Sequence, residues 1–242
     1  MQAYIGDYIE MSNVDIPGKT CDVISFSGCD FNCPYCFTPE MLKFNEELLT
    51  DIKDIKQKIK NNSNIVDAII FSGGEPCFQR QALLELARFA KKLGLEVFLH
   101  TNGSKPECLI SLFKDNLVDS VIFDIKTVSE QVFEKTTKSK TFFKQTEQIM
   151  QDIRQSIQLI QEYEIEVEFR TVVVPTLIYR KEDLIAIGKL IEELGPWRLV
   201  KFKPGNCLNK KFNAINPPTD IFIENLKEII GRECKKIKLL LD

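Results

Sequence analysis

The chain has 242 residues, of which 44% are hydrophobic and 28% are charged, and its formal net charge is −3. Acidic and basic residues are interspersed, which excludes a polybasic surface for nucleic acid or anionic membranes. No apolar run reaches the roughly 18 to 20 residues of a membrane span, and the N-terminus has no basic-then-apolar signal segment. We therefore expect a cytoplasmic globular protein that binds neither nucleic acid nor a membrane.

After the opening segment, short runs rich in Val, Ile and Phe alternate with longer amphipathic segments. The predicted strands are Val23–Phe26, Val66–Phe71, Val97–Leu99, Ser120–Ile125, Val167–Val174 and Leu199–Phe202. Apolar residues at helical spacing place Leu48, Ile52, Ile55 and Ile59 on one helix face, and likewise the groups Ile149 to Ile160 and Leu184 to Leu194. Shorter helices are predicted for Pro106–Asn116 and Thr219–Gly231, with Thr219 as an N-cap. Gly94 and Gly195 are expected to end the helices that precede them.

About six βα units predict a parallel sheet with right-handed crossovers, and six such units can close partway into a barrel. The expected fold is therefore α/β, a partial (β/α)6 TIM-like barrel with parallel strands, in a single domain that spans residues 1–242. In such sheets ligands bind at the C-terminal ends of the strands. We therefore expect the chemically active residues directly after strands.

Eight cysteines and a single histidine restrict the metal chemistry of the chain. A His-rich zinc site, a two-histidine iron site and an HExxH protease are excluded, so a metal must sit mainly on sulfur. Cys29, Cys33 and Cys36 follow the first predicted strand with C-x3-C-x2-C spacing, which lets three thiolates converge on one centre. Two interpretations are open: a cubane iron–sulfur cluster with one iron free for a small molecule, or a structural zinc site with Cys21 or Cys77 as fourth ligand.

The triplet, with Tyr35 just before its last cysteine, resembles the signature of the radical S-adenosylmethionine superfamily. The resemblance implies that Cys29, Cys33 and Cys36 hold a [4Fe-4S] cluster whose open iron is chelated by the amino and carboxylate groups of S-adenosylmethionine, with Tyr35 among the cofactor-binding residues. One electron from the reduced cluster then cleaves the sulfonium into methionine and a 5′-deoxyadenosyl radical. The cofactors carry this chemistry, so no catalytic side chain beyond them is expected.

The segment Ser72-Gly73-Gly74-Glu75-Pro76 follows the second predicted strand and resembles the GGE motif of that superfamily. Paired glycines let the backbone approach a ligand closely, and the Glu75 carboxylate can accept hydrogen bonds from the ammonium group of the cofactor. Taken alone, the segment would be an ordinary turn. Its position one βα unit after the cysteines favours a role for Gly73, Gly74 and Glu75 in cofactor binding.

A Thr-Asn-Gly segment at 101–103 follows the third predicted strand, and a D-x-K segment at 124–126 ends the fourth. Both look like segments of enzymes that activate glycyl-radical enzymes, such as pyruvate formate-lyase activating enzyme. The resemblance implies that Asp124 and Lys126 lie at the polar end of the cofactor, with Asp124 also helping to bind a monovalent cation, and that Thr101 is a cofactor-binding residue. Asp124 and Lys126 are two residues apart on one strand and point to the same side. A solvated ion pair is the alternative for Lys126.

Residues 170–175 read R-x-V-V-V-P and resemble a segment of the same activators. The resemblance implies that Arg170 contacts the cofactor carboxylate and that Val172 belongs to the cofactor site. The planar guanidinium suits this role because it binds a carboxylate bidentately and stays charged. Next to Phe169 and a run of valines, an unpaired arginine would be costly to bury, so a partner is expected.

Two positions depart from the activator pattern. His100 stands where activators of the pyruvate formate-lyase type carry an aspartate, and a neutral imidazole is a poorer ligand for a hard cation. The sixth strand is followed by residues 203–207, KPGNC, without the histidine that those enzymes place nearby, a contact that Asn206 could replace. His100 has two open interpretations, a proton-transfer group or a packed, hydrogen-bonded residue, and is left outside the catalytic set.

The remaining cysteines share no C-x-x-C spacing and are expected to be buried small hydrophobes. They are Cys21, Cys77, Cys108, Cys207 and Cys234. Cys207 is the exception to watch because it follows the sixth predicted strand, on the presumed active face.

The resemblance runs from residues 14–18 through the triplet to about Asn206, and it is greatest to the compact anaerobic ribonucleotide reductase activating proteins. It implies an oxidoreductase that cleaves S-adenosylmethionine reductively and generates a glycyl radical on a partner enzyme, here anaerobic ribonucleoside-triphosphate reductase, with a flavodoxin- or ferredoxin-type electron donor. One alternative is a radical enzyme acting on a small molecule or peptide, of the deazapurine synthase or maturase type. The other is a zinc or iron–sulfur module without catalysis. The D-x-K and R-x-V-V-V-P segments favour the activator.

Overall fold

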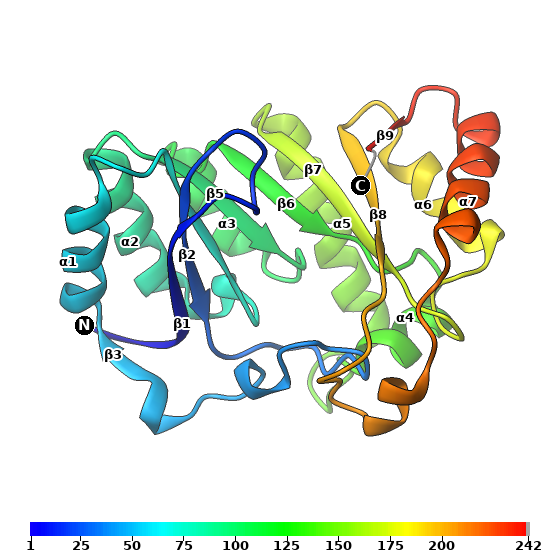
Figure 1. Ribbon diagram of the computed structural model, residues 1–242, viewed down its shortest axis with the longest axis horizontal. Helices are drawn as coiled ribbons and strands as arrows, with labels where there is room; N and C mark the ends of the chain where they lie inside the picture. Colours follow the sequence, from blue (N-terminus) through cyan, green and yellow to red (C-terminus); the bar gives the residue numbers. More distant parts are fainter. Residues whose placement is uncertain (241–242) are drawn as a thin grey trace. The chain divides into compact units, whose positions relative to one another are not determined.

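The computed structural model describes residues 1–240, whose helices and strands are labelled in Figure 1. These residues form two compact units, each of which is considered by itself. Unit 1 comprises Met1–Asp30, Glu40–Ile122 and Gln155–Glu166. Unit 2 comprises Phe31–Pro39, Phe123–Arg154 and Val167–Asp242. The division matters for the candidate site because a boundary falls between Cys29 and Cys33.

Unit 1 has a sheet with an antiparallel edge and a parallel centre. Its strands are β1 (Gln2–Ser12), β2 (Cys21–Phe26), β3 (Leu49–Asp51), β4 (Ala68–Gly73) and β5 (Glu96–Thr101). Its helices are α1 (Ile52–Asn62), α2 (Arg80–Lys92) and α3 (Pro106–Lys114), with short 3₁₀ turns η2 (Glu46–Leu48) and η3 (Pro76–Gln79). β1 is antiparallel to β2 and β3, whereas β2, β4 and β5 are parallel. β2 is a central strand covered on both faces, and all six of its residues are buried.

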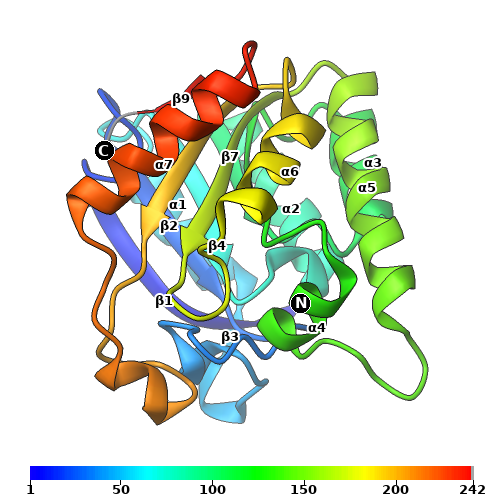
Figure 2. The ribbon, with the colours of Figure 1, turned by 90° about the vertical axis from the view of Figure 1, so that its right-hand side faces the viewer.

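Unit 2 has its strands β7 (Glu166–Val173), β8 (Pro196–Lys201) and β9 (Lys238–Leu239), which are parallel neighbours. Its helices are α4 (Glu130–Thr137), α6 (Lys181–Ile191) and α7 (Asp220–Glu233), with the 3₁₀ turn η4 (Lys210–Ala214). β7 begins with Glu166 of unit 1, and β6 (Ser120–Asp124), α5 (Thr146–Glu162) and the 3₁₀ turn η1 (Pro39–Met41) likewise contain residues of both units. Within unit 2, α6 lies beside α7, and α7 packs on β8 (Figure 2).

The hydrogen-bonded strand order is β3-β1-β2-β4-β5-β6-β7-β8-β9. The α/β class with a mainly parallel sheet, predicted from the alternation of strands and helices, is confirmed. All six predicted strands are present, as β2, β4, β5, β6, β7 and β8, with ends shifted by up to three residues. Among the helices of residues 1–240, none combines the length and the apolar character needed to cross a lipid bilayer.

The opening segment, for which no strand is predicted, forms the long strand β1. Ala3 and Ile5 are its buried residues, while most of its other side chains are partly or fully exposed. Gly6 and Asp7 are poor strand formers and interrupt the apolar alternation, so the pattern is too weak to predict this strand from sequence. Pairing with β2 determines its conformation instead.

Two predicted helix limits are wrong. Leu48 lies in η2 rather than in the first helix, because Asp51 caps α1 by accepting a hydrogen bond from the Lys53 N–H at 3.0 Å. Gly195 does not cap α6, which ends at Ile191 and is followed by Glu193 with a φ of 72°. A Cβ at Gly195 would lie 2.5 Å from the Val167 carbonyl oxygen, so a close backbone approach explains this glycine.

The other two predicted caps are confirmed. Gly94 follows α2 with a φ of 79°, the left-handed conformation that glycine adopts without a steric cost. Thr219 caps α7 by accepting a hydrogen bond from the Phe222 N–H at 3.2 Å.

The core of unit 1 includes one continuous face of its central strands. Cys21, Val23, Ala68, Ile70 and Phe98 form a buried cluster on β2, β4 and β5. The register pairs Val23 with Ile70 and Ile70 with Phe98, so the three strands contribute side chains at the same level. The same register pairs Ser25 with Ser72 two residues further along, where the cluster gives way to polar side chains. The polar layer is therefore at the C-terminal ends of the strands, where parallel sheets bind ligands.

Candidate active site

The first cysteine of the triplet lies in a loop of unit 1 that the following segment holds in place. The Gly28 N–H donates to the Met41 carbonyl at 2.7 Å, and the Cys29 N–H donates to the Leu42 carbonyl at 3.1 Å. Gly28 has a φ of 93°, and a Cβ there would lie 2.4 Å from the Phe44 ring. The loop therefore needs glycine for its backbone conformation and for the aromatic ring packed on it.

The second and third cysteines lie on a tight turn of unit 2, in which the Cys36 N–H donates to the Cys33 carbonyl at 2.9 Å. The segment after β8 holds this turn through two hydrogen bonds, from the Leu208 N–H to the Cys36 carbonyl at 3.2 Å and from the Asn209 N–H to the Pro34 carbonyl at 2.9 Å. Cys207 is thus adjacent in sequence to a residue that contacts the turn. Its expected position on the active face agrees with this contact.

Helix α4 holds the start of the same loop in unit 2. The Asn32 N–H donates to the Thr137 carbonyl, at the C-terminal end of α4, at 2.7 Å. The rings of Phe31 and Phe133 meet edge to face, with their centroids 5.7 Å apart. The loop that carries Cys33 is therefore held from two sides.

Unit 2 also places a partly buried ion pair near this turn. Lys126 Nζ and Asp124 Oδ2 are 2.8 Å apart, and the two side chains are 10% and 24% exposed. Burial alone would lower the pKa of Lys126, but the Asp124 carboxylate raises it well above its ordinary value. Lys126 is therefore a charged, largely buried member of an ion pair, and its place in the cofactor site stays a prediction.

Tyr35 and Cys33 are both buried in this region. Burial raises the pKa of the Cys33 thiol to about 12, with the Lys126 ammonium acting in the opposite direction. Burial likewise raises the pKa of Tyr35, so its hydroxyl is a proton donor. This hydroxyl lies beside the Cys33 thiol, yet it makes no hydrogen bond of ordinary geometry to any residue in the described part of the chain. A buried donor without a partner is rare in proteins and is satisfied when a ligand supplies the acceptor.

The two glycines of the GGE segment are explained by backbone packing inside unit 1. Gly73 has a φ of 115°, and a Cβ there would lie 2.3 Å from the Phe26 carbonyl oxygen of β2. A Cβ at Gly74 would lie 2.5 Å from the Gly28 carbonyl oxygen. The Glu75 N–H donates to that same oxygen at 2.9 Å. The glycines therefore bring the end of β4 against the end of β2 and the start of the cysteine loop.

Glu75 is fully buried and accepts three hydrogen bonds. Its donors are the Cys77 N–H at 3.0 Å, the Thr101 hydroxyl at 2.8 Å and the Asn102 N–H at 2.7 Å. Burial raises the pKa of Glu75 to about 7 in spite of these donors. Glu75 and Thr101, both predicted cofactor-binding residues, are thus hydrogen-bonded to each other and join the ends of β4 and β5.

Asn102 is a residue of this region that the sequence reasoning did not single out. Its side-chain nitrogen lies 3.9 Å from Cys29 Sγ and 3.3 Å from Asp30 Oδ1. Lys105 Nζ pairs with Asp30 Oδ2 at 2.8 Å. Asn102 belongs to the Thr-Asn-Gly segment that resembles one in the activators, which could have indicated it, but only Thr101 is assigned a role from the sequence.

His100 contacts the polar layer at the strand ends. Its Nδ1 lies 3.3 Å from the Ser72 hydroxyl oxygen on the neighbouring strand β4. This contact agrees with the interpretation of His100 as a hydrogen-bonded residue at the rim of the sheet. Its proton-transfer role stays a prediction.

Arg170 has the partner that was expected. Its Nε lies 2.6 Å from Glu168 Oε1 on the same face of β7, and Arg198 Nε on β8 lies 3.0 Å from the same oxygen. The register places Arg170 opposite Arg198 and Val172 opposite Val200. Although burial opposes it, hydrogen bonds from Arg198 and Arg170 lower the pKa of Glu168. Glu168 and Arg198 were not predicted, because only strand pairing brings Arg198 to this carboxylate.

Other predicted positions have simpler surroundings. The Asn206 amide donates to the Phe37 carbonyl at 3.4 Å, next to the last cysteine of the triplet.

The five cysteines outside the triplet are all buried, as expected, and form no disulfide in the described part of the chain. Among residues 1–240, no three His, Cys, Asp or Glu side chains are grouped as for a metal ion. The assignment of Cys29, Cys33 and Cys36 as cluster ligands stays a prediction.

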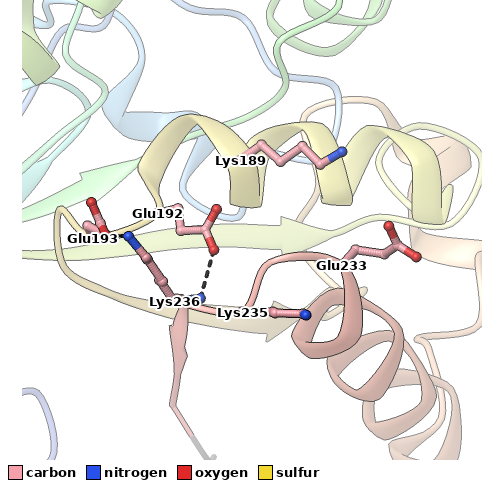
Figure 3. A pocket seen from close by; sticks show the side chains of 6 residues that line it. All are labelled: Lys189, Glu192, Glu193, Glu233, Lys235 and Lys236. Atoms are coloured by element: carbon pink, nitrogen blue, oxygen red, sulfur yellow. Dashed lines mark hydrogen bonds and ion pairs between the residues drawn. The ribbon is translucent and has the colours of Figure 1, made fainter.

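A hollow of about 490 Å³ lies in unit 2 at the ends of α6 and α7 (Figure 3). It is lined by Lys189, Glu192, Glu193, Glu233, Lys235 and Lys236. The Lys236 N–H donates to the Glu192 carboxylate at 2.7 Å, and the Lys236 ammonium pairs with Glu193. Because α6 leads into the N-terminal end of β8, the hollow lies at the opposite end of this strand from the segment that holds Cys36. We assign it no part in the site.

Comparison with known proteins identifies the family. The model of the radical SAM superfamily matches residues 23–187. A Methanocaldococcus jannaschii protein named as a glycyl-radical enzyme activating enzyme is 31% identical over 236 residues, which cover 98% of this chain and 93% of that protein. The pyruvate formate-lyase-activating enzyme of Clostridium pasteurianum is 25% identical, covering 94% of this chain and 92% of that enzyme.

A solved structure has the same fold. The crystal structure of a radical SAM methyltransferase from Sphaerobacter thermophilus superposes with a TM-score of 0.68 at 12% identity, covering 93% of this chain and 67% of that chain. At this identity the likeness concerns the fold, the partial TIM-like barrel that the alternation of strands and helices predicted. The chain thus belongs to the radical S-adenosylmethionine superfamily, whose enzymes use a [4Fe-4S] cluster and S-adenosylmethionine.

Proposed function

We propose that this protein activates a glycyl-radical enzyme by generating the radical on one backbone glycine of its partner, which we take to be anaerobic ribonucleoside-triphosphate reductase. The observation that carries the proposal is likeness over nearly the whole chain to a pyruvate formate-lyase-activating enzyme and to a second protein whose name assigns it to the glycyl-radical enzyme activating enzymes. The D-x-K and R-x-V-V-V-P segments, which separate activators from other branches in sequence, agree with it. The protein would act as one catalytic domain spanning residues 1–242.

The cluster would be held by Cys29, Cys33 and Cys36. Within unit 2 the surroundings of the last two fit such a group, because Cys33 and Cys36 share one turn and the neighbouring Tyr35 hydroxyl has no hydrogen-bond acceptor in the part of the chain that the structure describes. Iron–sulfur clusters bind thiolates. Because its pKa is high, the Cys33 thiol is protonated before the metal binds, and it loses this proton on binding. When bound, the cluster supplies the electron that cleaves S-adenosylmethionine into methionine and a 5′-deoxyadenosyl radical.

The cofactor-binding roles differ between the units. In unit 2 the Lys126 ammonium and the Arg170 guanidinium would bind the cofactor carboxylate, Asp124 and Tyr35 would engage its polar groups, and Val172 would line the site. In unit 1 Glu75 retains acceptor capacity beyond its three hydrogen bonds, while Gly73, Gly74 and Thr101 shape the loop around it. Because His100 stands where the activators carry an aspartate, the proposal does not require the monovalent cation.

The reaction requires one electron for each cleavage, and a flavodoxin- or ferredoxin-type protein would deliver it. A reducing compartment suits a protein whose eight cysteines form no disulfide within the described residues, so we place the enzyme in the cytoplasm. The substrate would be a protein loop that carries the target glycine.

The test is anaerobic reconstitution with iron and sulfide, followed by reduction with dithionite in the presence of S-adenosylmethionine. We expect 5′-deoxyadenosine by chromatography and, after addition of the reductase, the doublet signal of a glycyl radical in electron paramagnetic resonance. No 5′-deoxyadenosine would contradict the enzymatic function altogether. 5′-Deoxyadenosine without a radical on the reductase would instead favour the alternative, a small-molecule or peptide substrate.

A further inference from the structure

Two neighbouring phenylalanines in unit 2 are almost completely exposed. Phe142 and Phe143 are 92% and 91% exposed, whereas no other phenylalanine in residues 1–240 exceeds the 56% of Phe37. Each phenylalanine that becomes buried removes roughly 150 to 250 Å² of surface from water. A side chain of this kind is normally kept inside, so an exposed pair calls for an explanation.

A tight turn presents these two rings to solvent. The Thr141 N–H donates to the Lys144 carbonyl at 3.0 Å, and the Lys144 N–H donates to the Thr141 hydroxyl at 3.0 Å. Phe142 and Phe143 are the two central residues between these ends, and their rings meet edge to face with centroids 5.3 Å apart. We call residues 141–144 the Phe–Phe turn. Figure 2 shows the connection between α4 and α5 that carries it as a loop standing away from α4.

The surroundings of the Phe–Phe turn are basic. Lys138 and Lys140 precede it and Lys144 closes it. Lys144 pairs with Asp152, whereas neither Lys138 nor Lys140 forms an ion pair within the described residues. An apolar tip beside uncompensated positive charge is complementary to a partner surface that has an apolar pocket with acidic residues at its rim.

The Phe–Phe turn is also connected to the loop that carries Cys33. Four residues before the turn, the Thr137 carbonyl accepts the hydrogen bond from the Asn32 N–H at 2.7 Å. The Thr137 and Ser139 hydroxyl oxygens are 2.8 Å apart and both buried, so the chain between α4 and the turn is tied down. A partner held at the turn would be held by an element that also supports the candidate active site.

We propose that the Phe–Phe turn is a docking element for the protein substrate, with Phe142 and Phe143 entering an apolar pocket on the partner and Lys138 and Lys140 facing its acidic rim. The inference rests on the proposed function, which requires a protein loop as substrate. Aromatic anchors of this kind supply most of the binding energy in many protein interfaces. A membrane is the less favoured occupant, because basic clusters that bind anionic lipid have roughly four to eight Lys or Arg residues, whereas Lys144 is paired with Asp152 and only Lys138 and Lys140 remain beside the turn.

The double variant Phe142→Ser/Phe143→Ser tests the proposal, and it should fold because both side chains are exposed. We expect it to form 5′-deoxyadenosine without reductase at the wild-type rate. At subsaturating anaerobic ribonucleoside-triphosphate reductase from the same organism, we expect the yield of glycyl radical to fall at least about tenfold, with recovery at saturating reductase. Lys140→Glu should lower the yield by roughly threefold, more at low salt than at high salt.

Ile221→Ser is the matched control, since Ile221 lies in α7 of the same unit and is 75% exposed. It should leave both readouts unchanged. Radical yield within twofold of wild type in the double variant would overturn the docking role, as would an equal loss in Ile221→Ser. Binding of the wild type to phosphatidylserine vesicles that the double variant loses, with reductase activation intact, would overturn it in favour of a membrane.

The same experiment separates the two proposals. A wild-type protein that cleaves S-adenosylmethionine but leaves no radical on the reductase overturns the proposed function, and with it the reductase as the occupant of the turn. If the wild type and the double variant give the same yield of glycyl radical on the reductase, only the docking role is overturned.

Discussion

The candidate residues of unit 1 and those of unit 2 differ in how far other residues of the protein already provide their packing and hydrogen-bond partners. In unit 1, Gly73 and Gly74 face backbone atoms at distances that leave no room for a side chain, and Glu75 accepts three hydrogen bonds from its own unit. In unit 2, the Tyr35 hydroxyl is buried without a hydrogen-bond acceptor among residues 1–240, and the largely buried Lys126 ammonium pairs with one carboxylate, that of Asp124. Both sets match family motifs equally well in sequence.

The difference indicates that the motif residues of unit 1 mainly shape the backbone and that those of unit 2 would mainly bind a ligand. The GGE and Thr-Asn-Gly segments of unit 1 build the loop and hold it, and a ligand would be an additional partner for them. In unit 2 the Tyr35 hydroxyl is costly to bury unless a ligand accepts its hydrogen bond, and the Lys126 ammonium keeps donors beyond the one that it gives to Asp124. Substitutions in unit 1 should therefore act mainly on stability, and those in unit 2 mainly on cofactor binding.

The largest effect is expected for Cys33→Ala in unit 2. Removing one thiolate leaves two protein ligands for the cluster, so the variant should lose the brown absorbance of the reconstituted protein and all formation of 5′-deoxyadenosine. Cys21→Ala is the control, because Cys21 is equally buried but lies outside the triplet. An unchanged absorption spectrum in Cys33→Ala would refute the ligand assignment. Loss of the absorbance in Cys21→Ala would make Cys21 a fourth ligand of the cluster and would contradict an iron left open for S-adenosylmethionine.

Gly73→Ala should show that unit 1 uses this glycine for its own packing. A Cβ 2.3 Å from the Phe26 carbonyl oxygen, at a φ of 115°, forces the strands apart. We expect the free energy of unfolding of the cluster-free protein, measured by urea titration, to fall by about 3 kcal/mol. Gly231→Ala is the control, because nothing lies within 4 Å of a Cβ there and alanine favours the helix. Equal stability of both variants would mean that Gly73 is retained for the ligand alone.

The pH dependence of stability should report the buried carboxyl group of Glu75. Its pKa is about 7 in the folded protein against 4.5 ordinarily, so the folded state binds the proton more tightly than the unfolded state. The stabilisation is fully present below pH 4.5 and is lost as the pH rises to 7, by about 2 kcal/mol between pH 5 and pH 7. Urea titrations of the cluster-free protein across this range should show the loss in the wild type and not in Glu75→Gln. An identical slope in both proteins would contradict the assignment to Glu75.

The smallest effect is expected for Glu168→Gln in unit 2. Its carboxylate joins arginines on two neighbouring strands, and its side chain is 20% exposed. Because solvent partly screens this group, we expect a loss of about 1 kcal/mol in the free energy of unfolding. If the arginines need this carboxylate to hold their geometry, the Michaelis constant for S-adenosylmethionine should rise as well. Glu166→Gln, at an exposed position of the same strand, should change neither quantity.

Much of the fold was predictable because its signals are local. The runs of β-branched residues located the six strands β2 and β4 to β8, since strand length and composition are properties of a few consecutive residues. The edge strand β1 was missed because Gly6 and Asp7 interrupt its alternation and its pairing with β2 decides its conformation. Leu48 and Gly195 were misassigned for a related reason, since a cap at Asp51 and the approach of Val167 set the real limits.

The sequence by itself determined which chemistry stands at the ends of the strands: sulfur after β2, a carboxylate after β4, the D-x-K pair at β6 and an arginine in β7. Only the tertiary structure decided which hydrogen-bond or ion-pair partner each group has. Glu75 receives donors from residues 26 and 27 positions away, and Arg198 reaches Glu168 through strand pairing. The exposure of Phe142 and Phe143 likewise depends on what packs around their turn. Such contacts join residues far apart in the chain, and no local pattern encodes them.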